Sequence, residues 1–121
     1  MIKFRYVYSN GKEIKTFIYT IEEIERGWHE WTNLGDFKLI SRDRFTGLKD
    51  KNGVEIFEND VCNVLNYASD YLKRTGKMKC VIEWSDTSGF FGRGVGVPTG
   101  FAMGEDFEII SNTHIEKLKD K

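Results

Sequence analysis

The sequence contains little proline, cysteine or histidine, and it has no long apolar run. One proline, two cysteines and two histidines occur among 121 residues. Cys62 and Cys80 are too far apart to form a Cys-x-x-Cys motif, which excludes a redox or zinc motif of that kind. No apolar stretch approaches the ~20 residues that cross a bilayer, and the N-terminal text lacks the apolar core of a signal peptide. We therefore expect a cytoplasmic protein without membrane partners, in which both cysteines are buried thiols.

Neither sign of charge is in excess. The chain carries 18 Lys and Arg against 19 Asp and Glu, which gives a formal net charge of -1. Non-specific binding of nucleic acid draws its free energy from cations that release counterions from many phosphates, and this requirement usually produces a basic excess. The composition therefore argues against a general nucleic-acid-binding protein.

One local basic cluster departs from this balance. It consists of Lys73, Arg74, Lys77 and Lys79, with Tyr71 beside it. Cations interleaved with aromatic rings can bind single-stranded nucleic acid through phosphate contacts and base stacking. A nucleic-acid-binding module that uses these five residues is therefore one alternative function.

Motifs for catalysis or for metal binding are also missing. The run Gly92-Arg-Gly-Val-Gly96 has neither the spacing of a dinucleotide-binding loop nor the ending of a P-loop. His29 and His114, the histidines available as general bases, lie in no motif, and there is no His-x-x-x-His or calcium-loop spacing. We therefore predict no catalytic residue, no cofactor and no metal ion. A small enzyme of unknown reaction is the second alternative.

The residues that are present favour a folded, mainly β protein. Apolar residues make up 40% of the chain and aromatic residues 14%, which is sufficient for an ordinary core. Alternation of apolar and polar residues predicts strands at 2–8, 13–19, 37–45, 61–65, 78–85 and 107–110. In the first of these, Ile2, Phe4, Tyr6 and Tyr8 are expected to form the single buried face. Capping-box patterns predict short helices at 21–26, after Thr20, and from Thr113 through Leu118.

Turn residues divide these elements. Asn10-Gly11 predicts a type I′ hairpin turn, and Asp50-Lys-Asn-Gly53 predicts a second tight turn. Asn59 suits a left-handed backbone, and Asp60 next to it can accept hydrogen bonds from nearby amides and brace the bend.

Three segments lack clear periodicity. Residues 66–77 read as a long excursion or a mobile helical turn. Residues 89–104 hold six glycines and the proline, which predicts a loop with at most one short strand. Trp28 and Trp31 lie close together and are expected to be core or interface anchors.

One stretch carries a family resemblance. The text "FTGLKDKNGVEIFENDV", from Phe45 to Val61, resembles the signature of the YopX family of small phage and prophage proteins. Further similarity lies in "IKFR" at residues 2–5, in Trp84, and in "FEIISN" at residues 107–112. Asn59 and Ser111 stand where glycine is common in the family, and an asparagine retains the left-handed conformation.

The resemblance implies a small SH3-like barrel in the C-terminal half, preceded by an N-terminal β-hairpin and a short helix. One domain over 1–121 would then consist of an N-terminal part at 1–46, a barrel-forming part at 47–112 and a helical turn at 113–121. The family supplies no catalytic residues to transfer. We expect a non-enzymatic phage or prophage accessory protein in the cytoplasm of a bacterial host. It would act through contacts with an unknown phage or host protein, as a homo-oligomer whose long loops order on assembly.

Overall fold

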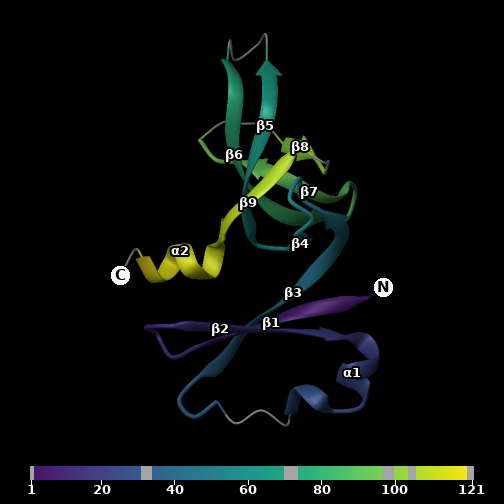
Figure 1. The fold of residues 1–121 in the computed structure, drawn as a ribbon, viewed down its shortest axis with the longest axis vertical. Helices are drawn as coiled ribbons and strands as arrows, with labels where there is room; N and C mark the ends of the chain where they lie inside the picture. The colour runs from purple at the N-terminus through teal and green to yellow at the C-terminus, as the bar shows by residue number, and fades with distance from the viewer. Residues whose placement is uncertain (1, 31–33, 70–73, 97–99, 104–105, 120–121) are drawn as a thin grey trace.

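A computed structural model describes residues 2–30, 34–69, 74–96, 100–103 and 106–119. Two antiparallel sheets stand one above the other, and a long strand connects them (Figure 1). The first sheet has the order β2-β1-β3-β4, and the second has the order β8-β7-β6-β5-β9. The strands are β1 (Lys3–Ser9), β2 (Ile14–Thr20), β3 (Lys38–Lys49), β4 (Glu55–Phe57), β5 (Asp60–Ser69), β6 (Arg74–Ser85), β7 (Gly89–Gly94), β8 (Gly100–Ala102) and β9 (Phe107–Asn112). The predicted mainly β fold is confirmed.

The N-terminal hairpin is present, but its turn differs from the predicted type I′. Ser9 pairs with Ile14, so four residues form the loop. A type I′ turn needs a positive φ at both central residues. Gly11 has a φ of 88°, but Asn59 is the one non-glycine residue with a positive φ in the described part of the chain. Asn10 instead uses its side-chain oxygen, which accepts hydrogen bonds from the amides of Lys12 and Glu13 at 2.9 and 2.8 Å.

The expected single buried face of β1 is also wrong. Tyr6 is buried as expected, but Ile2 is 63% exposed, and Val7 and Arg5 on the opposite face are buried. Strand β1 lies between β2 and β3, and the second sheet covers part of its other face. The residue pattern of β1 alone could not show that both faces are buried, because one of the buried side chains on the second face is the charged Arg5.

The first helix forms as its capping box predicts. Helix α1 spans Ile21–Glu25, and Thr20 Oγ1 accepts a hydrogen bond from the Glu23 amide while the Glu23 carboxylate accepts one from the Thr20 amide. A single 3₁₀ turn follows at Trp28–Glu30. Trp28 is 50% exposed, so it is not a core residue. Trp31 lies outside the described residues.

Strand β3 is longer than predicted and crosses from the first sheet to the second part of the molecule (Figure 1). It pairs with β1 over Lys38 to Arg44 and with β4 at Phe45 and Lys49. Leu39 and Ile40 near its start are 37% and 51% exposed. The predicted strand ended at Phe45, whereas the observed strand continues to Lys49.

The segments at 66–77 and 89–104 contain more strand than predicted. Residues 66–69 and 74–77 extend β5 and β6 into a hairpin that projects from the rest of the molecule (Figure 1). Backbone pairing in such an arm needs no apolar face, so its polar sequence gave no strand signal. Strands β7 and β8 form within the glycine-rich segment. Gly92 is required there, because a Cβ at this position would lie 2.7 Å from Cys80 Sγ.

The second sheet encloses the apolar core. Its members are Ile56, Cys62, Val64, Met78, Cys80, Ile82, Phe101 and Phe107. Cys62 and Cys80 face each other across β5 and β6 as buried free thiols, which confirms the predicted state. Burial raises the pKa of both thiols, that of Cys80 to about 11. No pairing among the described strands closes this sheet into the small barrel that the resemblance implied.

Helix α2 (Thr113–Lys119) follows β9 directly and lies beside the junction of the two sheets (Figure 1). Its cap differs from the predicted one. The Ile115 amide donates to Asn112 Oδ1 at 2.9 Å, so Asn112 and not Thr113 caps the helix. Among the described residues, none of the helices is long and apolar enough to span a bilayer.

Candidate functional site

The stretch from Thr46 to Cys62 turns the chain twice. In the first turn, Asp50 Oδ1 accepts hydrogen bonds from the amides of Asn52 and Val54, and Oδ2 accepts one from the amide of Ile109 on β9. Burial alone would raise the pKa of Asp50, but these three backbone donors outweigh it and lower that pKa. The carboxylate therefore ties the turn to β9 and does not face a substrate cleft.

The second turn has the predicted geometry. Asn59 has a φ of 73°, and Asp60 Oδ2 accepts a hydrogen bond from the Phe57 amide at 2.8 Å. The Asn59 amide donates to Ile82, and its carbonyl accepts from the amide of Thr113. The bend therefore joins β6 and the start of α2, and it places two polar side chains at the junction of the sheets.

Five polar side chains meet at that junction; we call Arg5, Asp43, Asn59, Asp60 and His114 the junction cluster. Arg5 Nε and Nη2 donate to Asp43 Oδ2 at 3.0 and 2.8 Å, and Arg5 Nη1 donates to Asp60 Oδ1 at 2.6 Å. Asn59 Nδ2 donates to Asp43 Oδ1 at 2.8 Å. His114 Nε2 lies 3.1 Å from Asp43 Oδ2. The cluster thus links β1, β3, β5 and α2.

The two aspartates of the cluster have opposite pKa shifts. Burial raises the pKa of Asp43, but hydrogen bonds from His114, Ser41, Arg5 and Asn59 outweigh it and lower that pKa to about 2. Asp60 has fewer donors, so burial prevails and its pKa is raised despite the Arg5 guanidinium. Asp43 is therefore the firmly ionised partner of the arginine.

A polar cavity of about 490 Å³ adjoins the cluster; we call it the junction cavity. Its wall combines hydroxyl, amide, imidazole, ammonium and aliphatic groups from Ser9, Ile14, Ile40, Ser41, Asn59, Thr113, His114, Lys117 and Leu118. His114 is 8% exposed, and Asp43 beside it is fully buried. The cavity therefore opens onto the imidazole, while the aspartate lies behind it.

The two histidines considered as possible bases have different surroundings. His29 packs near the rings of Tyr6 and Tyr19, with centroid distances of 5.5 and 6.3 Å. His114 belongs to the junction cluster. The sequence does not identify Arg5 or Asp43 as partners of His114, because the three residues lie far apart in the chain. The alternation in β1 places Arg5 on the face predicted to be exposed, so it gives no signal of this cluster.

Three basic residues of the alternative function lie along β6. Arg74, Lys77 and Lys79 belong to β6, and the Lys79 side chain is exposed. Lys73 and Tyr71 lie outside the described residues. The hairpin therefore brings three of the five residues onto one strand. No group of three or more His, Cys, Asp or Glu side chains in the described ranges could hold a metal ion.

Exposed apolar side chains gather in a groove between the two sheets; we call it the intersheet groove. Ile18 of β2, Val54 of the turn before β4 and Ile110 of β9 line it, with exposures of 50%, 52% and 46%. The groove has a volume of about 370 Å³. Among the described strands, β2 and β9 lie at the edges of their sheets, and residues of both strands line the groove.

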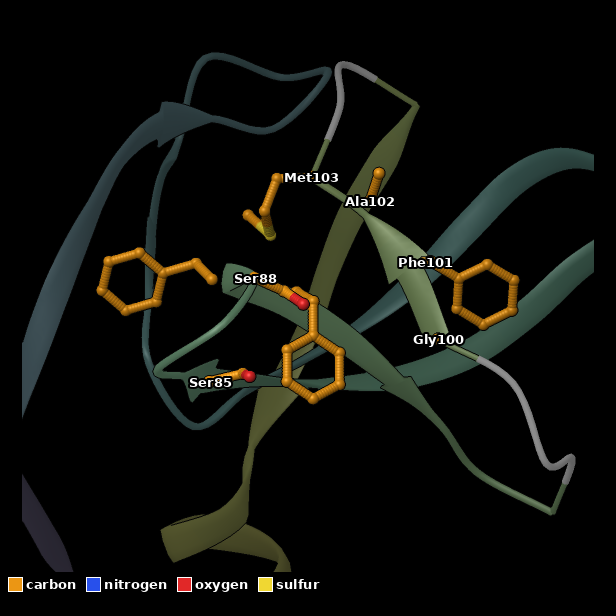
Figure 2. Close-up of a pocket in the computed structure, with 8 residues that line it drawn as sticks. Ser85, Ser88, Gly100, Phe101, Ala102 and Met103 are labelled. Atoms are coloured by element: carbon orange, nitrogen blue, oxygen red, sulfur yellow. The ribbon is translucent and has the colours of Figure 1, made fainter.

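A third hollow lies over β7 and β8. Figure 2 shows Ser85, Ser88 and Met103 directed toward this space, whereas the Phe101 ring lies on the other side of β8. Its volume is about 550 Å³. The Ser85 hydroxyl is hydrogen-bonded to Thr87, which leaves it without a catalytic partner in the described region. The lining of this hollow combines the Ser85 and Ser88 hydroxyls with aromatic and aliphatic side chains.

Comparison with known proteins leaves one positive match. No curated protein matches the chain, and no solved structure matches it. A family model described as YopX protein matches residues 1–116, which is nearly the whole chain. This match includes both sheets and the junction cluster. The chain therefore belongs to the YopX family.

Proposed function

We propose that the protein is a non-enzymatic phage or prophage accessory protein that acts through protein–protein contacts as a homo-oligomer. The observation that carries this proposal is the intersheet groove. Three large apolar side chains are about half exposed there, and soluble proteins rarely leave such groups together unless another surface covers them.

The strand edges beside the groove support the same function. An edge strand presents unpaired amides and carbonyls, which a strand from another chain can satisfy. Every residue of β2 from Ile14 to Thr20 is exposed or only partly buried, which leaves the strand accessible for pairing with a second strand. A second copy of this chain, docking at β2 and covering Ile18 and Ile110, is the occupant that we propose.

The oligomeric state tests this proposal. Light scattering coupled to size-exclusion chromatography should give the mass of an oligomer for the native chain and of a monomer for Ile110→Lys. Leu48→Lys is the matched control, because Leu48 is 44% exposed but does not line the groove. A monomeric native chain, or equal masses for Ile110→Lys and the native chain, contradicts the proposal.

Nucleic-acid binding is the second candidate, since Arg74, Lys77 and Lys79 all lie on β6. A fluorescence-anisotropy titration with a labelled single-stranded oligonucleotide measures it. Binding that weakens steeply between about 50 and 200 mM salt, and weakens further in Lys79→Ala, supports this function. Absence of binding at the lower salt concentration contradicts it.

A further inference from the structure

The junction cavity has the features of a ligand site, and the proposed protein–protein contacts at the intersheet groove do not involve it. We propose that it binds a small anion that carries an apolar ring and a hydrogen-bond donor. Its volume of about 490 Å³ falls within the range of small-molecule sites, roughly 300–1,000 Å³. The size alone selects no chemistry, so the argument depends on the groups that line the cavity.

The imidazole of His114 supplies an oriented acceptor. Its Nε2 lies 3.1 and 3.3 Å from the two oxygens of Asp43, and Asp43 is ionised and fully buried. A carboxylate in this position accepts a hydrogen bond from the facing nitrogen, and the tautomer that this contact favours carries its lone pair on Nδ1. Nδ1 accepts no hydrogen bond from the described residues, and it is not a buried unsatisfied atom, so water reaches it. A ligand O–H or N–H group in the cavity can take the place of that water.

The charge of the lining selects an anion. Lys117 is the cation of the wall, and no acidic side chain is among the described residues that line the cavity. Asp43 lies behind His114, and its charge is compensated by Arg5 through two hydrogen bonds. The field inside the cavity is therefore positive on the Lys117 side, where a phosphate or carboxylate group fits.

The remaining wall is apolar. Ile14, Ile40 and Leu118 line it, and Ile40 is 51% exposed. A ring that covers Ile40 removes this apolar surface from water, which favours binding by roughly 25 cal/mol per Å². A ligand with an anionic group at Lys117, a donor at His114 and a ring on Ile40 satisfies all three parts of the wall.

The test is a titration of the whole chain, with its histidines labelled by ¹⁵N, observed through the imidazole nitrogens by NMR. Two probes represent the two sources of this chemistry: 4-hydroxyphenyl phosphate for phosphates and 4-hydroxybenzoate for carboxylates. We expect at least one probe to shift the His114 Nδ1 resonance strongly while the proton on Nε2 stays hydrogen-bonded to Asp43. The probe that binds identifies the class of anion. If neither probe shifts the His114 resonances, the proposal is overturned.

Variants confirm the position of the ligand without disturbing the cluster. Lys117 is exposed, so Lys117→Ala should fold normally and should weaken binding at least tenfold in calorimetry. Lys49→Ala is the control, because Lys49 is also exposed but lies outside the cavity lining. Equal affinity in Lys117→Ala and the native chain, or equal losses in both variants, overturns the proposal.

Discussion

The core of the second sheet buries aliphatic, aromatic and thiol side chains, whereas the junction of the two sheets buries an arginine, two aspartates and a histidine. Apolar burial has little directional preference and favours any close packing. Hydrogen bonds between charged groups demand particular distances and angles, and they leave a costly unpaired charge when they fail. The apolar core therefore stabilises one sheet, and the junction cluster fixes how the two sheets meet.

The strongest test of this difference removes the shared cation. Arg5→Ala leaves Asp43 and Asp60 buried, with exposed fractions of 0% and 2%, and without their guanidinium partner. We expect a loss of about 3–5 kcal/mol in the free energy of unfolding, because breaking a buried ion pair leaves uncompensated charge. Urea denaturation followed by circular dichroism measures it. A loss below about 1 kcal/mol would show that the two aspartates tolerate the loss of Arg5 as well as exposed residues would.

Acid should weaken the junction selectively. The folded-state pKa of Asp43 is about 2, below the ordinary value of 3.8, so its stabilisation is complete above pH 3.8 and is lost as pH falls toward 2. This contribution is on the order of 2 kcal/mol. The pKa of Asp60 is raised, so its contribution to stability changes with pH in the opposite direction. Asp60 is present in both the native chain and the Asp43→Asn variant, so its effect is common to the two.

The comparison is between the native chain and Asp43→Asn, in urea titrations at a series of pH values from 6 to 2. The native chain should lose more stability than the variant between pH 4 and pH 2. If the free energy of unfolding falls equally with pH in the two proteins, Asp43 does not contribute to the loss of stability in acid.

The apolar core should be destabilised by steric overpacking and not by the loss of a charge. A Cβ added to Gly92 would meet Cys80 Sγ at 2.7 Å and Cys80 Cβ at 3.2 Å. We expect Gly92→Ala to lower thermal stability by roughly 1–2 kcal/mol through overpacking. Cys80→Ala removes the obstructing sulfur, so Gly92→Ala should be milder in that background. An equal loss in both backgrounds would assign the effect to the backbone and not to the contact.

The smallest effect should come from an exposed ion pair of the same chemistry. Arg93 Nε lies 2.8 Å from Glu83 Oε2, but the two side chains are 52% and 37% exposed. Arg93→Ala should change the free energy of unfolding by less than about 1 kcal/mol, because water screens such pairs. The same urea assay measures both arginines. A loss as large as that of Arg5→Ala would mean that burial does not separate the two regions.

Local chemistry made part of the fold predictable. The Thr20 capping box, the bend at Asn59 and the brace from Asp60 depend on residues within a few positions of one another, and all three appear as expected. The type I′ turn at Asn10 failed because the Asn10 side chain offered the backbone another set of hydrogen bonds. Predictions from neighbouring residues were therefore correct except at Asn10, where two sets of local hydrogen bonds were possible.

The candidate sites were less predictable. Arg5, Asp43 and His114 are separated by 38 and 71 residues, so no spacing rule connects them. The intersheet groove likewise depends on Ile18 of β2, Val54 of the turn before β4 and Ile110 of β9. Each residue alone looked like an ordinary member of a strand or a turn, and only the packing of the sheets brought them together.

The sequence by itself determined the mainly β character, the first hairpin, the α1 cap, the Asn59 bend and the YopX family, because each depends on residues that are close in the chain. The tertiary structure alone decided which charges are buried, where the apolar groove lies and that the second sheet stays open. The physical reason is that burial and long-range pairing depend on which surfaces meet, and a single strand's pattern contains no information about its partner.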